Sequence, residues 1–323
     1  MSILYEFSFI LSVIGLFLTL ILNPVVIYIT LFKIQKILGI YRNLIVIAAL
    51  LGLCFSILDI LVHPFFHSYN EVFFYFTFQD VFGDFWMLAS LLLYAFLHSS
   101  LISFIAVQFI YRYFVVTNNP RASQFQGCKL ILWVSYAFSF GLIYTSAIFM
   151  LCPSSSQEKE QLRETFIETY NVLIEKTHGF VFVGNSGMAG SGSLLGVVVF
   201  QFSVMVFCGI RMNRELEKNQ NHMSNSYKNL QKQFLKVLVF QISGPCILFY
   251  LPLVPIFFAP LFKLKFSFES GVLISTFSLF PPIDSMILMS VVTEYRKSFK
   301  NLLKKNKISG IIVSPGQTIQ YVH

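Results

Sequence analysis

The 323-residue sequence is short of charge, because only 12% of its residues are Asp, Glu, Lys or Arg. A soluble domain has about 25% charged residues, so water is not the main solvent of this surface. Instead, 56% of the residues are hydrophobic, 17% are aromatic and the mean hydropathy is +0.71. These proportions exclude a large soluble domain and predict a protein that crosses a membrane several times.

Cysteine and N-terminal basic residues are also scarce. Of the five cysteines, only Cys152 is expected near the outer surface, so the chain cannot build an extracellular disulfide framework on its own. The first 32 residues contain neither Lys nor Arg, and they lack the small-residue cleavage pattern of a signal peptide. The first apolar stretch is therefore expected to remain as a membrane span.

Seven apolar stretches are long enough to cross a bilayer as helices, which takes about 20 residues each. They cover residues 8–31, 44–66, 85–110, 130–151, 194–210, 234–258 and 268–292. The apolar runs at 72–78 and 180–183 are too short to cross. The sequence thus predicts an all-α membrane protein, with a seven-transmembrane-helix domain at 1–292 and a tail at 293–323.

The distribution of Lys and Arg predicts the orientation of the bundle. With the N-terminus outside, 18 of the 23 basic residues fall on the inner side, as the positive-inside rule requires. The C-terminus is then cytoplasmic. The net charge of +8 belongs mainly to the inner face, which suits anionic membrane lipid and an acidic cytoplasmic partner and does not indicate nucleic-acid binding.

Two segments outside the spans have helical apolar spacing. Residues 158–176, in the longest outer loop, predict an amphipathic helix at the membrane or over the mouth of the bundle. Residues 294–306, after the last span, predict a short amphipathic helix on the inner leaflet. Between them, a glycine-rich return is expected to be flexible, and its glycines are Gly184, Gly187, Gly190 and Gly192.

Polar residues form a stripe along the third predicted span. Tyr94, His98, Gln108 and Arg112 fall on one helical face, and this face should point into the bundle because polar groups are costly towards lipid. At 1.5 Å per residue, His98 lies about 21 Å from Arg112, at the depth of a pocket open to the outside. Tyr94 and His98 are therefore candidate ligand contacts, and a structural interhelical hydrogen bond is the equal alternative.

Two carboxylates, Asp59 and Asp284, lie within predicted spans, where acids are functional candidates by default. Asp59 lies about 22 Å and Asp284 about 12 Å from the inner ends of their spans, so we expect separate roles. Asp284 follows Pro281 and Pro282, which lack backbone donors and weaken the helix. This position suits a switch near the cytoplasmic side.

The sequence contains no signature of an enzyme or a cofactor. A metalloprotease helix motif, a phosphate loop, a CxxC pair and a nucleophile elbow are all missing, and the last span has no Lys for retinal. His63 and His67 are four residues apart but have no evident third ligand, so a structural role is favoured over a metal site. The prolines of the sixth span, including Pro245 and Pro252, favour a kinked helix.

Several segments resemble the nematode seven-transmembrane chemoreceptors of the str type, also called serpentine receptor class r. They run in order from the second span to the tail, so the resemblance covers most of the chain. The segments are 57–64 (ILDILVHP), 67–69 (HSY), 108–113 (QFIYRY), 241–245 (QISGP), 250–252 (YLP), 282–284 (PID) and 295–296 (YR).

This resemblance implies an odorant or chemical receptor in the plasma membrane, in the ciliary membrane of a sensory neuron, that signals through a heterotrimeric G protein. Tyr111, Arg112 and Tyr113 then occupy the place of the Asp-Arg-Tyr motif of rhodopsin-like receptors. Because Tyr111 replaces the acid, Arg112 cannot be locked by its immediate neighbour, and the resting state must be restrained differently. The start of the third span, 84–86, also lacks the cysteine that rhodopsin-like receptors bridge to the outer loop.

The expected mechanism is a population shift, in which a small volatile or apolar molecule binds the outer half of the bundle and prefers the open inner state. Aromatic walls with a few polar anchors suit such a ligand. The candidate contacts are Trp86, Tyr94, His98, Tyr144, Gln201, Phe249 and Tyr250, and the candidate hinges are Pro245, Pro252, Pro281 and Pro282. The sequence leaves open whether receptors pair with one another.

Two other functions remain as alternatives. A ligand-gated cation channel of the insect odorant-receptor kind also has seven spans, but its N-terminus is inside, which the distribution of basic residues opposes. A small-molecule transporter often shows internal repeats and broken helices, and no repeat is visible here.

Overall fold

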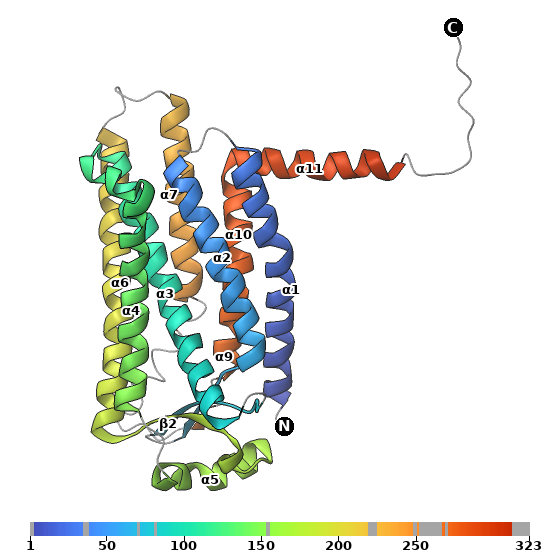
Figure 1. Cartoon of the computed structure of the whole chain (residues 1–323), viewed down its shortest axis with the longest axis vertical. Helices are drawn as coiled ribbons and strands as arrows, with labels where there is room; N and C mark the ends of the chain where they lie inside the picture. Colours follow the sequence, from blue (N-terminus) through green and yellow to red (C-terminus); the bar gives the residue numbers. More distant parts are fainter. Residues whose placement is uncertain are drawn as a thin grey trace.

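A computed structural model of the chain describes residues 3–34, 39–69, 72–80, 83–152, 156–218, 225–247, 251, 267–268 and 271–311. Long helices lie side by side along one axis (Figure 1). Within the described residues, six helical stretches are long and apolar enough to cross a membrane. They are α1 (Ile3–Phe32), α2 (Gly39–Val62), α3 (Asp84–Val116), α4 (Leu130–Leu151), α6 (Gly184–Lys218) and the stretch Leu273–Val291.

The predicted sixth span, 234–258, is described only in its first half. That half belongs to α7 (Asn225–Pro245), which packs against α3, α6 and α10 within the bundle (Figure 1). The rest of the predicted span, with Phe249, Tyr250 and Pro252, lies outside the described residues.

The last membrane stretch is interrupted rather than continuous. It consists of α9 (Gly271–Ser275), a 3-10 turn η5 (Thr276–Leu279) and α10 (Phe280–Val291). Pro281 and Pro282 are the second and third residues of α10, where a missing backbone donor costs little. The chain thus changes helix type immediately before the two prolines.

α1 shows how the bundle is built for lipid. Its buried face carries small and polar side chains, whereas large apolar side chains such as Phe17 and Ile10 are more than half exposed. Small residues allow close helix approach where lipid gives no hydrophobic driving force. Gly15 is an example, because a Cβ there would lie 2.6 Å from the Ser278 carbonyl oxygen of η5. The exposed apolar surface is therefore membrane-facing.

α3 is the central helix of the bundle. Its 33 residues span about 50 Å, which exceeds the roughly 30 Å hydrocarbon core of a bilayer. In the most apolar stretch of α3, 61% of the residues are buried, against 17% in the corresponding stretch of α4. The polar stripe of α3 is accordingly inside the protein, with Tyr94, Gln108 and Arg112 all buried.

A four-stranded antiparallel sheet closes the end of the bundle at which α1 begins (Figure 1). The strands are β1 (Phe65–Tyr69), β2 (Val72–Thr77), β3 (His178–Phe182) and β4 (Ser267–Phe268), in the order β3-β2-β1-β4. The two apolar runs that are too short to cross the membrane thus pair with each other, with Phe74 opposite Val181. Their backbone groups are satisfied across the sheet.

The outer helix α5 (Ser156–Tyr170) covers this sheet (Figure 1). Its apolar residues Leu162, Phe166 and Tyr170 are fully buried against Phe74 and Phe76 of β2. The helix is shorter than the expected 158–176, because a turn follows it and a separate 3-10 turn η3 forms at Ile174–Lys176. Sheet and helix together form a packed lid over one end of the bundle.

The expectation of a flexible glycine-rich return is wrong, because the four glycines lie within the first turns of α6. Packing explains two of them, Gly187 and Gly190. A Cβ on Gly187 would lie 2.5 Å from the Phe182 backbone, and one on Gly190 would lie 2.5 Å from Cys152 Sγ. Glycine therefore permits close approach between α6 and its neighbours here.

α11 (Thr293–Ile311) leaves the bundle at the end opposite the lid and turns away from its axis (Figure 1). The Thr293 N–H donates to Gln233 Oε1 of α7 at 2.9 Å. The Tyr295 and Thr30 hydroxyls are 2.7 Å apart, and Tyr295 is fully buried. These contacts fix the start of α11 against α1 and α7.

Candidate functional site

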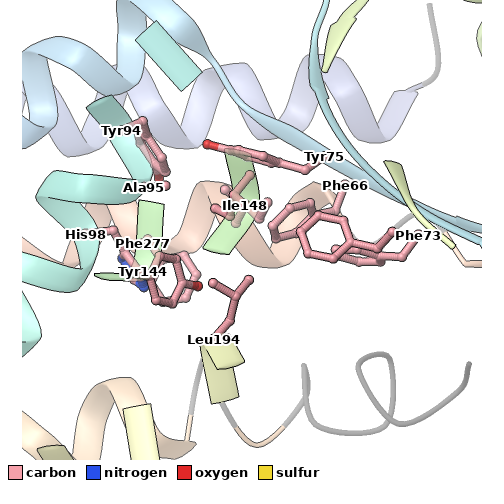
Figure 2. Close-up of a pocket in the computed structure, with 12 residues that line it drawn as sticks. Phe66, Phe73, Tyr75, Tyr94, Ala95, His98, Tyr144, Ile148, Leu194 and Phe277 are labelled. Carbon is pink, nitrogen blue, oxygen red and sulfur yellow. The ribbon is translucent and has the colours of Figure 1, made fainter. Parts of the chain in front are cut away.

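A cavity lies beneath the lid, between α3, α4, α6 and the last membrane stretch. About 550 Å³ of its space is free of atoms, which includes the open part of the cavity. Figure 2 shows the side chains around it, and aromatic rings form most of the wall. The lining residues are Phe66, Phe73, Tyr75, Tyr94, Ala95, His98, Tyr144, Ile148, Phe182, Leu194, Ile274 and Phe277. We call this space the outer cavity.

The strand β2 supplies two rings to the outer cavity because side chains alternate along a strand. Phe73 and Tyr75 point to the cavity, whereas Phe74 and Phe76 point to α5. Both faces of β2 are thus buried. The lid is therefore also the outer wall of the cavity.

The polar groups at the outer cavity are few and uncharged. The Tyr75 hydroxyl donates to the Leu91 carbonyl oxygen at 3.0 Å, and burial raises the pKa of Tyr75 well above its usual value. The His98 ring packs edge-on against Phe277, with ring centroids 4.4 Å apart. Among the described lining residues there is no Asp, Glu, Lys or Arg. Such a wall suits a neutral ligand, because burying an unpaired charge is costly.

Asp59 lies behind this wall rather than in it. It is only 1% exposed, and the hydroxyls of Ser12 and Tyr94 face its carboxyl group. Tyr94 thus has its ring at the outer cavity and its hydroxyl near the acid. One turn further out, His63 Nε2 lies 3.4 Å from Ser8 Oγ, which also hydrogen-bonds Ser275 Oγ.

The structure brings three of the expected ligand contacts together and separates others from them. Tyr94, His98 and Tyr144 line the outer cavity. Trp86 does not, because its side chain is 63% exposed near the start of α3. Gln201 is fully buried elsewhere, where its Oε1 accepts from the Tyr136 hydroxyl at 3.2 Å.

Arg112 lies at the other end of α3, between two aromatic rings. Its Cζ atom is 3.3 Å from the centroid of the Tyr41 ring and 3.8 Å from that of Phe234. Its Nη1 donates to Gln231 Oε1 at 3.0 Å. All four side chains are at least 97% buried. We call these four residues, from α2, α3 and α7, the Arg112 clamp.

The neighbours of Arg112 in the YRY motif have different surroundings. Tyr111 is buried and stacks on Tyr41, with centroids 6.0 Å apart. Tyr113 is partly exposed and contacts the Phe207 ring of α6. Tyr111 therefore supports the clamp from behind, while Tyr113 lies on the side of α3 that faces α6.

Asp284 lies between the outer cavity and the Arg112 clamp. It lines a small inner cavity with Gln108, Gln241 and Tyr41. The Gln241 side chain is within hydrogen-bonding reach of the Asp284 carboxyl group. On the neighbouring residue, the Ser285 hydroxyl donates to Asn23 Oδ1 at 2.7 Å. Asp59 and Asp284 are thus in separate environments.

The histidines do not come together as metal ligands. His67 Nδ1 lies 3.1 Å from the Tyr170 hydroxyl of α5, whereas His63 faces Ser8 of α1. Burial lowers the pKa of His67 to about 4, so the imidazole is neutral near pH 7. Within the described part of the chain, the group whose ligand atoms come within 4.8 Å of one another is Asp80, Asp84 and His178, at the exposed edge of the lid.

Sequence reasoning missed Tyr41, Phe234 and Gln231 of the clamp. The signal that could have found them is Arg112 itself, because an arginine on the inward face of a central helix needs buried partners. It also missed Phe66, Phe73 and Phe182, since the strands that carry them were not predicted.

Comparison with known proteins agrees with this architecture. The family model described as "Serpentine type 7TM GPCR chemoreceptor Str" matches residues 8–300. The chain is 38% identical over 303 residues to "G-protein coupled receptor str-33" of Caenorhabditis elegans, and the match covers 88% of each chain. It is 23% identical over 292 residues to "Serpentine receptor class r-10" of the same species, covering 84% of this chain and 85% of that protein.

A family model that covers most of the chain and a relative of this similarity define the family, whose members are multi-pass membrane receptors with seven spans. The chain therefore belongs to the Str family of serpentine seven-transmembrane G-protein-coupled chemoreceptors.

Proposed function

We propose that this receptor binds a small neutral molecule in the outer cavity and signals to a heterotrimeric G protein at the opposite end of the bundle. The observation that carries the proposal is the outer cavity itself. It is walled by rings and aliphatic groups, has no charged side chain among its described lining residues, and includes His98 and Tyr144 as polar contacts. A volatile, largely apolar molecule with one or two polar atoms matches that wall.

The orientation proposed here has the lid outside the cell and α11 in the cytoplasm. α1 begins at the lid end, and α11 extends from the other end (Figure 1). In the described part of α11, Arg296, Lys297 and Lys300 are exposed, whereas Phe299 is only partly exposed. A helix of this kind suits the anionic inner leaflet. A ciliary plasma membrane of a sensory neuron fits a receptor for external chemicals.

The Arg112 clamp supports assignment of the structure to the resting state. Arg112 is 3% exposed and enclosed by rings from α2 and α7, so a cytoplasmic protein cannot reach it. Coupling through Tyr111, Arg112 and Tyr113 requires α7 to move away from α3. The clamp is thus the restraint that replaces a lock by a neighbouring acid.

Asp284 is the proposed switch, and the proposed hinges are the change of helix type before α10 and the end of α7. The 3-10 turn η5 ends at Leu279, one residue before Pro281 and Pro282, and Asp284 follows them in the first turns of α10. Pro245 is the last residue of α7 as the structure describes it. A change of helix type concentrates bending at a few residues, so movement of α7 and α10 at these points can open the clamp.

A cell assay with a cavity-filling variant tests the proposed function. Ala95 is 5% exposed and lines the outer cavity, so Ala95→Phe fills space that a ligand would occupy. Cells that express the receptor and a G-protein reporter are exposed to a panel of neutral volatile compounds. We expect wild type to respond to some compounds and Ala95→Phe to lose at least tenfold in potency for them.

The matched control is Leu142→Phe on α4, a site that is 62% exposed and faces lipid. It should keep the wild-type response at equal surface expression. If Ala95→Phe responded as the control does, ligand binding in the outer cavity would be refuted. A response in cells that lack G proteins would point to a channel instead.

A further inference from the structure

A second cavity lies directly inward of the outer cavity. It contains about 400 Å³ of atom-free space, including its open part, and it shares His98 and Phe277 with the outer cavity. Its walls come from α2, α3, α6, α7, η5 and α10, with Ile105 and Met205 among the apolar contributors. We call it the deep cavity.

Two rings divide the outer cavity from the deep cavity. His98 and Phe277 pack edge-to-face with centroids 4.4 Å apart, and Phe55 lies 6.2 Å from His98 on the inner side. Figure 2 shows His98 and Phe277 close together at one end of the outer cavity. Phe277 belongs to the 3-10 turn η5, next to the change of helix type at the start of α10.

The deep cavity has one open hydrogen-bond acceptor at its inner end. Gln241 lines the cavity and is only 4% exposed. Its Oε1 atom has no hydrogen-bond partner within the part of the chain that the structure describes. Its NH2 group is the only part of the amide that can donate, and the side chain is within hydrogen-bonding reach of Asp284.

A buried acceptor without a donor is costly, by about 1–3 kcal/mol. The other lining side chains are almost all apolar, and none of those described is charged. A molecule that suits this site therefore has a carbon chain and ends in a neutral donor. A hydroxyl group is the smallest such donor.

We propose that the deep cavity is a second subsite of the ligand pocket, which takes the leading end of an elongated primary alcohol whose hydroxyl donates to Gln241 Oε1. The proposal rests on the proposed function and narrows it to a ligand class. The alkyl chain passes between His98 and Phe277, and the outer cavity holds its other end.

This subsite gives the ligand a direct contact with the inner half of the bundle. Gln241 lines both the deep cavity and the inner cavity, where Asp284 and Tyr41 also lie. Tyr41 is part of the Arg112 clamp. A hydroxyl that donates to Gln241 thus contacts the side chain that faces Asp284. Asp284 in turn lines the inner cavity together with Tyr41 of the clamp.

The test uses the purified full-length receptor in lipid nanodiscs. The probes are the 1-alkanols from butanol to decanol and the methyl ether of each, which has no hydroxyl donor. Protection against thermal unfolding gives a half-maximal concentration for each probe. In wild type, each added methylene should improve that concentration about fourfold up to a cut-off length, and each alcohol should surpass its ether.

Four variants test the proposal. Ile105→Phe fills the deep cavity and should raise the half-maximal concentration of every alcohol, the short ones included, and reduce the preference for alcohol over ether; Met205→Phe fills it from α6 and replaces the first variant if that fails to fold. Gln241→Leu should reduce the preference for alcohol over ether by about fivefold. Ile210→Phe makes the same exchange on an exposed face of α6 and should change nothing.

The proposal is overturned if the filled variants bind alcohols as wild type does, if Gln241→Leu keeps the full preference for alcohols, or if no alcohol protects wild type. None of these results would contradict the proposed function, which is ligand binding in the outer cavity. The proposed function is tested separately by the cell assay with Ala95→Phe and the panel of volatile compounds. That assay does not depend on the deep cavity or on a hydroxyl group in the ligand.

Discussion

The Arg112 clamp makes a quantitative prediction about signalling without ligand. Tyr41→Leu removes the ring that lies 3.3 Å from the guanidinium carbon while keeping an apolar side chain at a buried position. A desolvated cation–π contact contributes about 2 kcal/mol, which corresponds to a factor of about 30 in an equilibrium constant. This energy is lost only from the closed state, because once α7 has moved away the Arg112 side chain must leave the Tyr41 ring to reach a cytoplasmic protein.

The change in basal activity follows from that factor. If about 1% of resting receptors are active, a value typical of minor conformations, Tyr41→Leu raises the active fraction to roughly 20%. The assay is the G-protein reporter signal without ligand, normalised to receptor at the cell surface. Tyr41→Phe is the matched control, because it retains the aromatic face and removes only the hydroxyl group, which also interacts with Arg112; its basal activity should stay well below that of Tyr41→Leu.

Two results would contradict a restraining role for the Tyr41 ring. Unchanged basal signalling in Tyr41→Leu at normal surface expression would show that the clamp does not restrain the receptor. Equal activation in Tyr41→Phe would assign the restraint to the hydroxyl group rather than to the ring. Phe234→Leu tests the other face of the guanidinium in the same way, because its ring lies 3.8 Å from Arg112 Cζ.

The remaining predictions concern the lid, the packing of α6 and the orientation. Burial lowers the pKa of His67 to about 4, against an ordinary 6.5. Between these two pH values the unfolded state binds more protons than the folded state, so up to about 3 kcal/mol of folding stability is lost as the pH falls from about 6.5 to about 4. In thermal unfolding, His67→Gln should lose less stability over this pH range than wild type does. Gly190→Ala should destabilise by about 1–3 kcal/mol because its Cβ would meet Cys152 Sγ at 2.5 Å, whereas Gly192→Ala, with open space around it, should not lower the melting temperature. A tag at the N-terminus should stain in intact cells, and a tag after Lys307 only after permeabilisation.

The helical part of the fold was predictable from the sequence because long apolar runs have few alternatives in a membrane. The polar stripe on the third span also identified the inward face of α3, as the burial of Tyr94 and Arg112 confirms. The lid was not predictable. β2 is buried on both faces, so it reads as a continuous apolar run without the alternation that indicates a strand.

The glycines of α6 show a second limit of sequence reasoning. Their composition indicates a flexible loop, but close packing against Phe182 and Cys152 requires small residues within a helix. Only the tertiary arrangement separates these two reasons for glycine.

The functional site was also only partly predictable from the sequence. The helical period places Tyr94 and His98 on one face, while Trp86 starts α3 on a different face and is largely exposed. Which residues meet Arg112 depends on how α2 and α7 pack against α3, and the period of one helix carries no information about that. Tyr41 and Phe234 therefore had to come from the structure.

Coupling of the outer cavity to a G protein is tested by nucleotide exchange on a purified heterotrimeric G protein, driven by the purified receptor and titrated with a volatile compound that activates the receptor in cells. We expect this compound to accelerate exchange with wild-type receptor and with Leu142→Phe, and Ala95→Phe to shift the titration to at least tenfold higher concentration. Exchange that does not respond to the compound, or that responds equally in Ala95→Phe, would contradict a receptor that couples its outer cavity to a G protein.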